Sequence, residues 1–90
     1  MKSFKTSTQY RKDLKRYKNN HSKLKALAVV LDMLAAEIPL PAEYCPHMLQ
    51  GNYKGCMECH IGSDFLLVWF DEENDVIELV RLGTHSELFG

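Results

Sequence analysis

The chain has 90 residues, of which 46% are hydrophobic and 26% are charged, and its formal net charge at pH 7 is −1. These values are typical of one soluble globular domain over residues 1–90, and they leave no room for a second domain. No apolar run approaches the ~20 residues of a membrane-spanning helix, and the N-terminus has no signal-like apolar core. We therefore expect a cytoplasmic protein with reduced cysteines and no membrane contact.

The near-zero net charge hides a strong asymmetry. Residues 1–25 hold nine basic residues and a single acid, Asp13, whereas residues 26–90 hold two basic residues and eleven acids. A basic end suits phosphate groups or an acidic partner. Lysines and arginines that only coat the solvated face of a helix produce the same pattern, so the charge alone does not decide between these interpretations.

The N-terminal part is predicted to be helical after a short edge strand over residues 2–5. Serine and threonine at positions 6–8 can cap a helix over residues 9–18, whose apolar stripe is Tyr10, Leu14 and Tyr17. A turn follows, and Ser22 is expected to cap a second helix with apolar residues at helical spacing up to Pro39. The short turn predicts an antiparallel helical hairpin.

The remainder is predicted to form a loop and three strands. Residues 39–55 contain prolines and closing glycines and indicate a long loop, which in so small a domain is usually functional. Strand-like runs follow at residues 56–61, 65–70 and 76–82, separated by tight turns. The predicted fold class is α+β, with the helical hairpin packed on a small antiparallel sheet. The tail, residues 83–90, is too short for another element, but its Leu88 and Phe89 should pack back on the domain.

The cysteines suggest two cofactor sites that we reject. Residues 56–60 match the C-x-x-C-H pattern of covalently attached haem, but that attachment follows export, and the motif lies in a predicted strand. A zinc site from Cys45, Cys56, Cys59 and neighbouring histidines is disfavoured because strand residues three apart point to opposite faces. Cys59 is more simply explained as a small core residue.

The alternation of the first long strand points His60 away from the hydrophobic core, together with Cys56 and Glu58. His47 in the loop and His85 in the tail can approach the same open face, and Asp64 follows His60 at the next turn. Histidine is suited to proton transfer near neutral pH. Spacing alone does not establish that these side chains converge.

Four blocks of sequence carry a specific resemblance. They are Pro39–Ala42 with Tyr44 and His47–Gly51, Lys54-Gly55 with Glu58–His60, Asp64–Val68, and Arg81–Phe89. With the N-terminal helical segment the match spans almost the whole chain. Together they resemble the YafQ family, a branch of the RelE superfamily of bacterial toxin–antitoxin toxins. Two positions depart from the family pattern: Ser63 stands where proline is usual, and Cys56 where an aromatic residue is usual.

The resemblance implies a small endoribonuclease that cleaves messenger RNA on the ribosome, with no metal and no cofactor. The implied catalytic residues are His47, His60, Asp64 and His85. The implied substrate contacts are Arg81 at the scissile phosphate, the rings of Phe65 and Phe89, and Lys54. Docking on ribosomal RNA is assigned to the basic helix through Arg11, Lys12, Lys15 and Arg16. The implied partner is a cognate, DinJ-like antitoxin.

Such residues can cleave RNA by attack of the ribose 2′-hydroxyl on the adjacent phosphorus. His47 or Asp64 would act as the base, His85 as the acid, and Arg81, helped by His60, would stabilise the charge that develops on phosphorus. Asp64 would alternatively orient His60. Two other functions stay open. One is a superfamily relative that blocks DNA gyrase by binding, although such relatives lack this histidine set. The other is a degenerate toxin that only binds its antitoxin.

Overall fold

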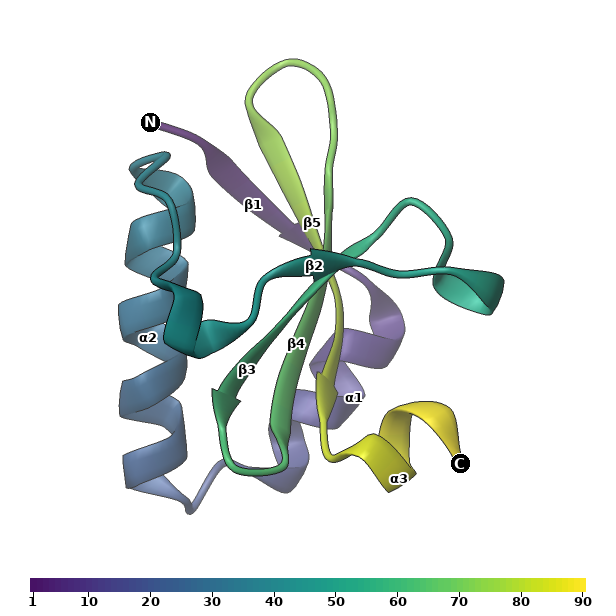
Figure 1. Ribbon diagram of the computed structural model, residues 1–90. Helices are drawn as coiled ribbons and strands as arrows, with labels where there is room; N and C mark the ends of the chain where they lie inside the picture. Colours follow the sequence, from purple (N-terminus) through teal and green to yellow (C-terminus); the bar gives the residue numbers. More distant parts are fainter.

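The computed structural model describes all 90 residues as three helices on a five-stranded sheet with strand order β1-β5-β4-β3-β2 (Figure 1). The strands are β1 (Ser3–Thr6), β2 (His47–Met48), β3 (Met57–Gly62), β4 (Phe65–Asp71) and β5 (Val76–Gly83). The helices are α1 (Thr8–Arg16), α2 (His21–Ala35) and α3 (His85–Phe89). The mixed α+β class predicted from the sequence is confirmed. None of the helices combines the length and the apolar character needed to cross a bilayer.

The three predicted strands form an antiparallel meander of β3, β4 and β5. The short N-terminal strand is confirmed as an edge strand, and it pairs in parallel with β5. The segment that was predicted as a long loop contains β2 and two short 3-10 turns, Ala42–Tyr44 and Gly51–Tyr53. β2 pairs with β3, with His47 opposite Glu58, and this register brings the loop histidine beside the sheet.

The predicted cap of α1 is confirmed, and that of α2 is wrong. The Ser7 hydroxyl accepts a hydrogen bond from the backbone N–H of Tyr10 at the start of α1. At α2 the cap is Asn20, whose side chain accepts from the backbone N–H of Lys23, and Ser22 lies inside the first turn. Asn and Ser are about equally good caps, so composition did not separate the two positions.

The helical hairpin itself is not confirmed. α1 packs on β5 and α2 packs on β3, so each helix makes its main contacts with the sheet and not with the other helix. A cavity of about 440 Å³ lies between them, lined by Leu14 and Leu24 together with basic side chains of α1. The physical reason is that the apolar stripe of α1 is narrow, and its buried residues Tyr10 and Tyr17 are taken up by the sheet.

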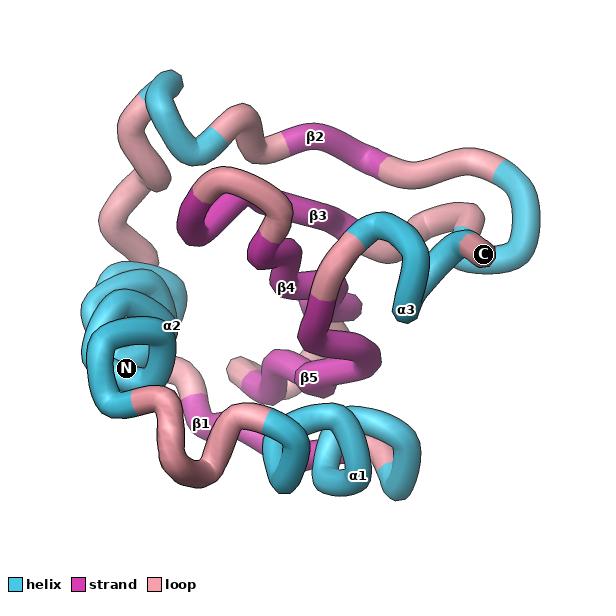
Figure 2. Tube along the Cα trace, turned by 90° about the horizontal axis from the view of Figure 1, so that it is seen from below, coloured by secondary structure: helices cyan, strands magenta, loops and turns pink.

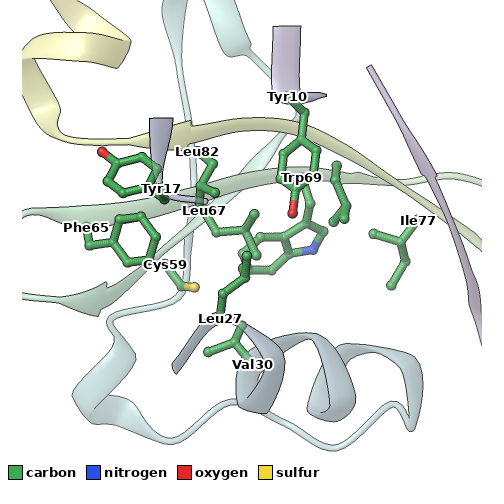
Figure 3. Packing of buried hydrophobic residues seen from close by; sticks show 11 residues of the cluster. Tyr10, Tyr17, Leu27, Val30, Cys59, Phe65, Leu67, Trp69, Ile77 and Leu82 are labelled. Atoms are coloured by element: carbon green, nitrogen blue, oxygen red, sulfur yellow. The ribbon is translucent and has the colours of Figure 1, made fainter. Parts of the chain in front are cut away.

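The sheet separates a large core from a small one. The large core lies under α1 and α2, and Figure 3 shows Leu27 and Val30 of α2 pointing toward the sheet, where Cys59 and Leu67 are fully buried. The smaller cluster is on the other face, where Leu88 of α3 covers Leu66 and Val68. Figure 2 shows α2 and α3 on opposite sides of the sheet. The prediction that Cys59 is a core residue is confirmed.

The C-terminal tail is more ordered than predicted. It forms the short helix α3, which corrects the expectation that it was too short for an element of its own. Leu88 is buried, as expected, whereas Phe89 is 48% exposed. The small cluster, and α3 above it, thus define the open face on which His60 was predicted to lie.

Candidate active site

Three histidines from three different elements gather on the open face of the sheet. His47 comes from β2, His60 from β3 and His85 from the start of α3. The ring centroids of His47 and His60 are 6.1 Å apart, and those of His60 and His85 are 5.6 Å apart. Their side chains are between 37% and 57% exposed. The three candidate catalytic histidines therefore form one solvent-accessible cluster.

Asp64 fixes the orientation of His85. Its Oδ1 accepts hydrogen bonds from the backbone N–H of His85 at 2.8 Å and from the ring Nδ1 at 2.9 Å. The backbone bond first, and then the ring bond, lower the pKa of Asp64 below its ordinary value of 3.8. The carboxylate is therefore charged at neutral pH, and Nε2 of His85 is left free to exchange a proton with a substrate.

The lowered pKa of Asp64 also sets the pH range of this contact. Because the folded pKa lies below the unfolded one, the stabilisation is complete above about 3.8 and is lost as the pH falls through the lower folded value. The Asp64 carboxylate that makes this contact is thus charged throughout the neutral pH range.

A capping box holds the short helix that carries His85. Thr84 accepts from the backbone N–H of Glu87, and the Glu87 carboxylate accepts from the backbone N–H of Thr84. The same carboxylate accepts a 2.6 Å hydrogen bond from the hydroxyl of Tyr17, which ties α3 to the region of α1. Gly83 has a φ of +152°, which favours glycine, and a Cβ there would lie 2.5 Å from Oε1 of Glu87, so the Glu87 side chain would have to move.

Arg81 is held by a buried acid that the sequence analysis did not single out. Its Nε donates to Oδ2 of Asp13 at 2.7 Å, and its terminal nitrogens donate to Asp13, to the hydroxyl of Tyr53 and to the Glu87 carbonyl. Asp13 is fully buried, which alone would raise its pKa, but hydrogen bonds from Arg81, Leu82 and Gln9 lower it. Removing Arg81 would leave the buried Asp13 carboxylate without a cation, which typically lowers the free energy of unfolding by about 3–5 kcal/mol. Arg81 therefore supports the fold as well as the site.

The two candidate aromatic contacts differ in their accessibility. The ring of Phe89 lies 5.8 Å from that of Tyr53 and 6.3 Å from that of His85, at the border of the histidine cluster. Phe65 is only 2% exposed, and its ring packs 4.9 Å from that of Tyr17 in the large core. The prediction of Phe65 as a substrate contact is therefore wrong, because Phe65 begins β4 on the face that α2 covers. Its ring packs in the large core, on the face of the sheet opposite the histidines.

The histidine cluster is an open surface and not a pocket. A cavity of about 580 Å³ lies elsewhere, between the end of α2 and the sheet, where Leu34, Met57 and Trp69 are among its lining residues. A smaller hollow of about 270 Å³ adjoins Asp64 and Lys23 at the start of α2. Neither cavity includes the three histidines, so the chain alone does not enclose a substrate there.

The cysteines do not converge with the histidines. Cys59 faces the large core, whereas Cys56 packs on the small cluster of the opposite face, as their spacing in the strand predicts. Cys45 is exposed in the loop before β2. No group of three or more His, Cys, Asp or Glu side chains has a geometry that could hold a metal ion.

The comparison with family models is decisive for the classification. The model described as "Bacterial toxin of type II toxin-antitoxin system, YafQ" matches residues 2–90. The chain belongs to this family. The YafQ resemblance of the sequence motifs is thereby confirmed.

Individual relatives and solved structures agree with this result. The mRNA interferase toxin YafQ of Escherichia coli strain K12 is 35% identical over 85 residues, which cover 93% of this chain and 91% of the relative. The crystal structure of the E. coli DinJ–YafQ complex has 31% identity and a TM-score of 0.86, with full coverage of both chains. A metal-bound toxin from Helicobacter pylori has 43% identity and a TM-score of 0.87, covering 99% of this chain and all of the other.

The four basic residues that were predicted to dock on RNA, Arg11, Lys12, Lys15 and Arg16, are exposed, but two of them are engaged within the protein. Arg11 donates to the carbonyl and hydroxyl of Thr6, and Arg16 contacts Asp13 and Glu87. Lys12 and Lys15 have no ion-pair partner within the chain. These two lysines are the better candidates for RNA docking, while Arg16 links α1 to α3. Lys54 is exposed after the second 3-10 turn, and its role stays a prediction.

Sequence reasoning missed three residues that shape this site. Asp13 and Tyr53 hold Arg81, and Glu58 lies beneath His47 and His60. The alternation of β3 did place Glu58 on the face of His60, which was the available signal. It gave no indication that an acid on this open face would be 3% exposed.

Proposed function

We propose that this chain is the toxin of a type II toxin–antitoxin system and acts as a metal-independent mRNA interferase on the ribosome. The observation that carries the proposal is the Asp64–His85 pair, with Nε2 of His85 free beside His60. An exposed histidine oriented by a carboxylate is suited to proton transfer, which a binding inhibitor of gyrase or an inactive module does not require.

In the proposed reaction, a base takes the proton of the ribose 2′-hydroxyl, and the 2′-oxygen forms a bond to the adjacent phosphorus. The bond from phosphorus to the 5′-oxygen breaks, and His85 donates a proton from Nε2 to that oxygen. Asp64 orients the ring of His85 and is itself a poor base, because its pKa is lowered. The base is therefore one of the two other histidines, and Arg81 adds positive charge beside the phosphate.

The open site supports ribosome dependence. Because no cavity encloses the histidines, RNA would have to be held in the reactive geometry by a second surface. The ribosome in the cytoplasm can supply that surface, and the exposed lysines of α1 suit its RNA phosphates. The antitoxin of the proposed pair would be a DinJ-like protein, in analogy to the complex of the E. coli relative.

Expression of the chain alone in a bacterium tests the proposed function. We expect growth arrest together with new 5′ ends inside the coding regions of translated messages, because ribosome-bound RNA is the proposed substrate. Sequencing of RNA 5′ ends before and after induction measures this, and co-expression of the antitoxin should abolish both effects. Growth arrest with intact messages would favour the gyrase-inhibitor alternative.

Reversal of two lysines tests docking through α1. The variant K12E/K15E should bind ribosomes more weakly, because each lost phosphate contact reduces the salt slope of binding by about 0.7–0.9. Binding measured over a range of salt concentrations gives the slope. The control K25E reverses one charge, half the change of K12E/K15E, on α2 and outside the proposed surface. Equal slopes for both variants would indicate that the lysines of α1 only solvate a helix.

A further inference from the structure

Glu58 is a nearly buried acid at the centre of the histidine cluster. Its Oε1 lies 3.1 Å from Nε2 of His47 and 3.8 Å from Nε2 of His60, and its side chain is 4% exposed. Its Oε2 is buried and has no hydrogen-bond partner. The residue lies in β3 between His47 on one neighbouring strand and Val68 on the other. None of the roles assigned so far uses this carboxylate.

Both ring nitrogens of His47 face hydrogen-bond acceptors. Nδ1 lies 2.7 Å from the carbonyl oxygen of Cys45, and Nε2 faces the Glu58 carboxylate. A carbonyl oxygen only accepts, so Nδ1 carries a proton. Nε2 lies within ion-pair distance of the nearly buried Glu58 carboxylate, and that ion pair forms when Nε2 is protonated as well. His47 is left with no free lone pair, and it cannot take the proton of a 2′-hydroxyl in this arrangement.

The surroundings favour the charged form of this pair. A carboxylate beside the apolar cluster of Leu66, Val68 and Leu88 is costly unless a cation contacts it. Glu58 has no lysine or arginine partner, so His47 is the available cation. The His47 side chain is 46% exposed, and water can therefore solvate its positive charge on the side away from Glu58.

We propose that Glu58 is a positioning residue that holds His47 as a doubly protonated cation, which leaves His60 as the base of the cleavage reaction. This inference rests on the proposed ribonuclease function and replaces the sequence-based expectation that His47 or Asp64 is the base. His47 then contributes positive charge near the phosphate. His47 neutralises the charge of Glu58. The distance of 3.8 Å between Oε1 of Glu58 and Nε2 of His60 is too long for a hydrogen bond.

His60 and His85 have different neighbours, and this difference gives the two histidines different roles. His60 faces the neutralised pair from β3 and keeps a free lone pair, as a base requires. Nδ1 of His85 contacts the Asp64 carboxylate at 2.9 Å, and this contact orients the ring and leaves Nε2 free, as an acid requires. Environments that separate two titratable groups in this way assign the base and the acid of a reaction.

Nitrogen NMR of the histidine rings in the full-length chain tests the inference. In the wild type at neutral pH we expect protons on both ring nitrogens of His47 and on only one of His60. In E58Q, which keeps the shape and removes the charge, His47 should lose one ring proton. The control E43Q removes an exposed carboxylate near Cys45 and should leave the His47 signals unchanged.

Kinetics on programmed ribosomes give a second measurement that a purely structural role would not alter. E58Q should lower kcat by about 10-fold or more, less than the 10²–10⁴-fold of a direct acid or base, with little change in KM. Its pH profile should differ from that of the wild type, because His47 and His60 then share the protons differently.

An unprotonated ring nitrogen on His47 in the wild type would overturn the inference, and so would unchanged ring signals in E58Q. The wild-type spectrum decides even where E58Q fails to fold, which thermal unfolding reports. The spectra need no RNA. A doubly protonated His47 in a chain that cuts no message would therefore support the role of Glu58 and contradict only the proposed ribonuclease function.

Discussion

Replacement of His85 by alanine should reduce mRNA cleavage by at least 10²-fold and relieve growth arrest, because residues in general acid–base catalysis typically contribute 10²–10⁴-fold. The fold should persist. The backbone N–H of residue 85 can still donate to Asp64, and the Thr84–Glu87 capping box does not involve the ring. Single-turnover cleavage on programmed ribosomes measures the loss, and thermal unfolding reports the fold.

The matched control for this variant is His21→Ala, which removes an exposed histidine at the start of α2, an element on the opposite side of the sheet. It should cleave like the wild type. A folded H85A chain with undiminished cleavage would remove His85 from the mechanism and leave His60 and His47 as the only histidines at the site.

Local patterns were sufficient to predict four of the five strands, and the family resemblance supplied the set of site residues whose convergence the spacing had left open. The block from Arg81 to Phe89 illustrates why, since each of its distinctive residues has a local physical task. Gly83 permits the close approach of Glu87, Thr84 caps α3, and Leu88 covers the small cluster. The resemblance therefore carried information about geometry as well as about ancestry.

Contacts between residues far apart in sequence could not be predicted from the same patterns. The pairing of Arg81 with Asp13 spans 68 positions, and nothing in α1 marked its single acid as fully buried. The prediction that Phe65 contacts the substrate was wrong for a related reason. The first residue of a strand can face either side of a sheet, and the motif placed it beside Asp64 without specifying the face. The predicted helical hairpin was not confirmed, because a short turn determines that two helices are adjacent in sequence but not the surface on which each of them packs.

A message with a single 2′-deoxy or 2′-O-methyl nucleotide at the cut position should resist cleavage there while its binding stays nearly unchanged. The reason is that the acids at the site are Asp64, which orients His85, and Glu58, which contacts His47. The other acid-rich segment, Asp71–Asp75, pairs in part with Lys2 and Lys5 at the sheet edge. The chain therefore lacks the carboxylate cluster at the histidines that holds paired Mg²⁺ ions in hydrolytic nucleases.

The ends of the fragments distinguish the two chemistries. Attack by the 2′-hydroxyl leaves a 2′,3′-cyclic phosphate or a 3′-phosphate on one fragment and a 5′-hydroxyl on the other, which mass spectrometry of the fragments identifies. As a control, toxin that has been treated with a chelator and then separated from it before contact with ribosomes should cleave at the same rate. Cutting at the modified nucleotide, or fragments with a 5′-phosphate, would contradict 2′-hydroxyl attack and direct attention to a metal ion, such as the one bound by the H. pylori relative.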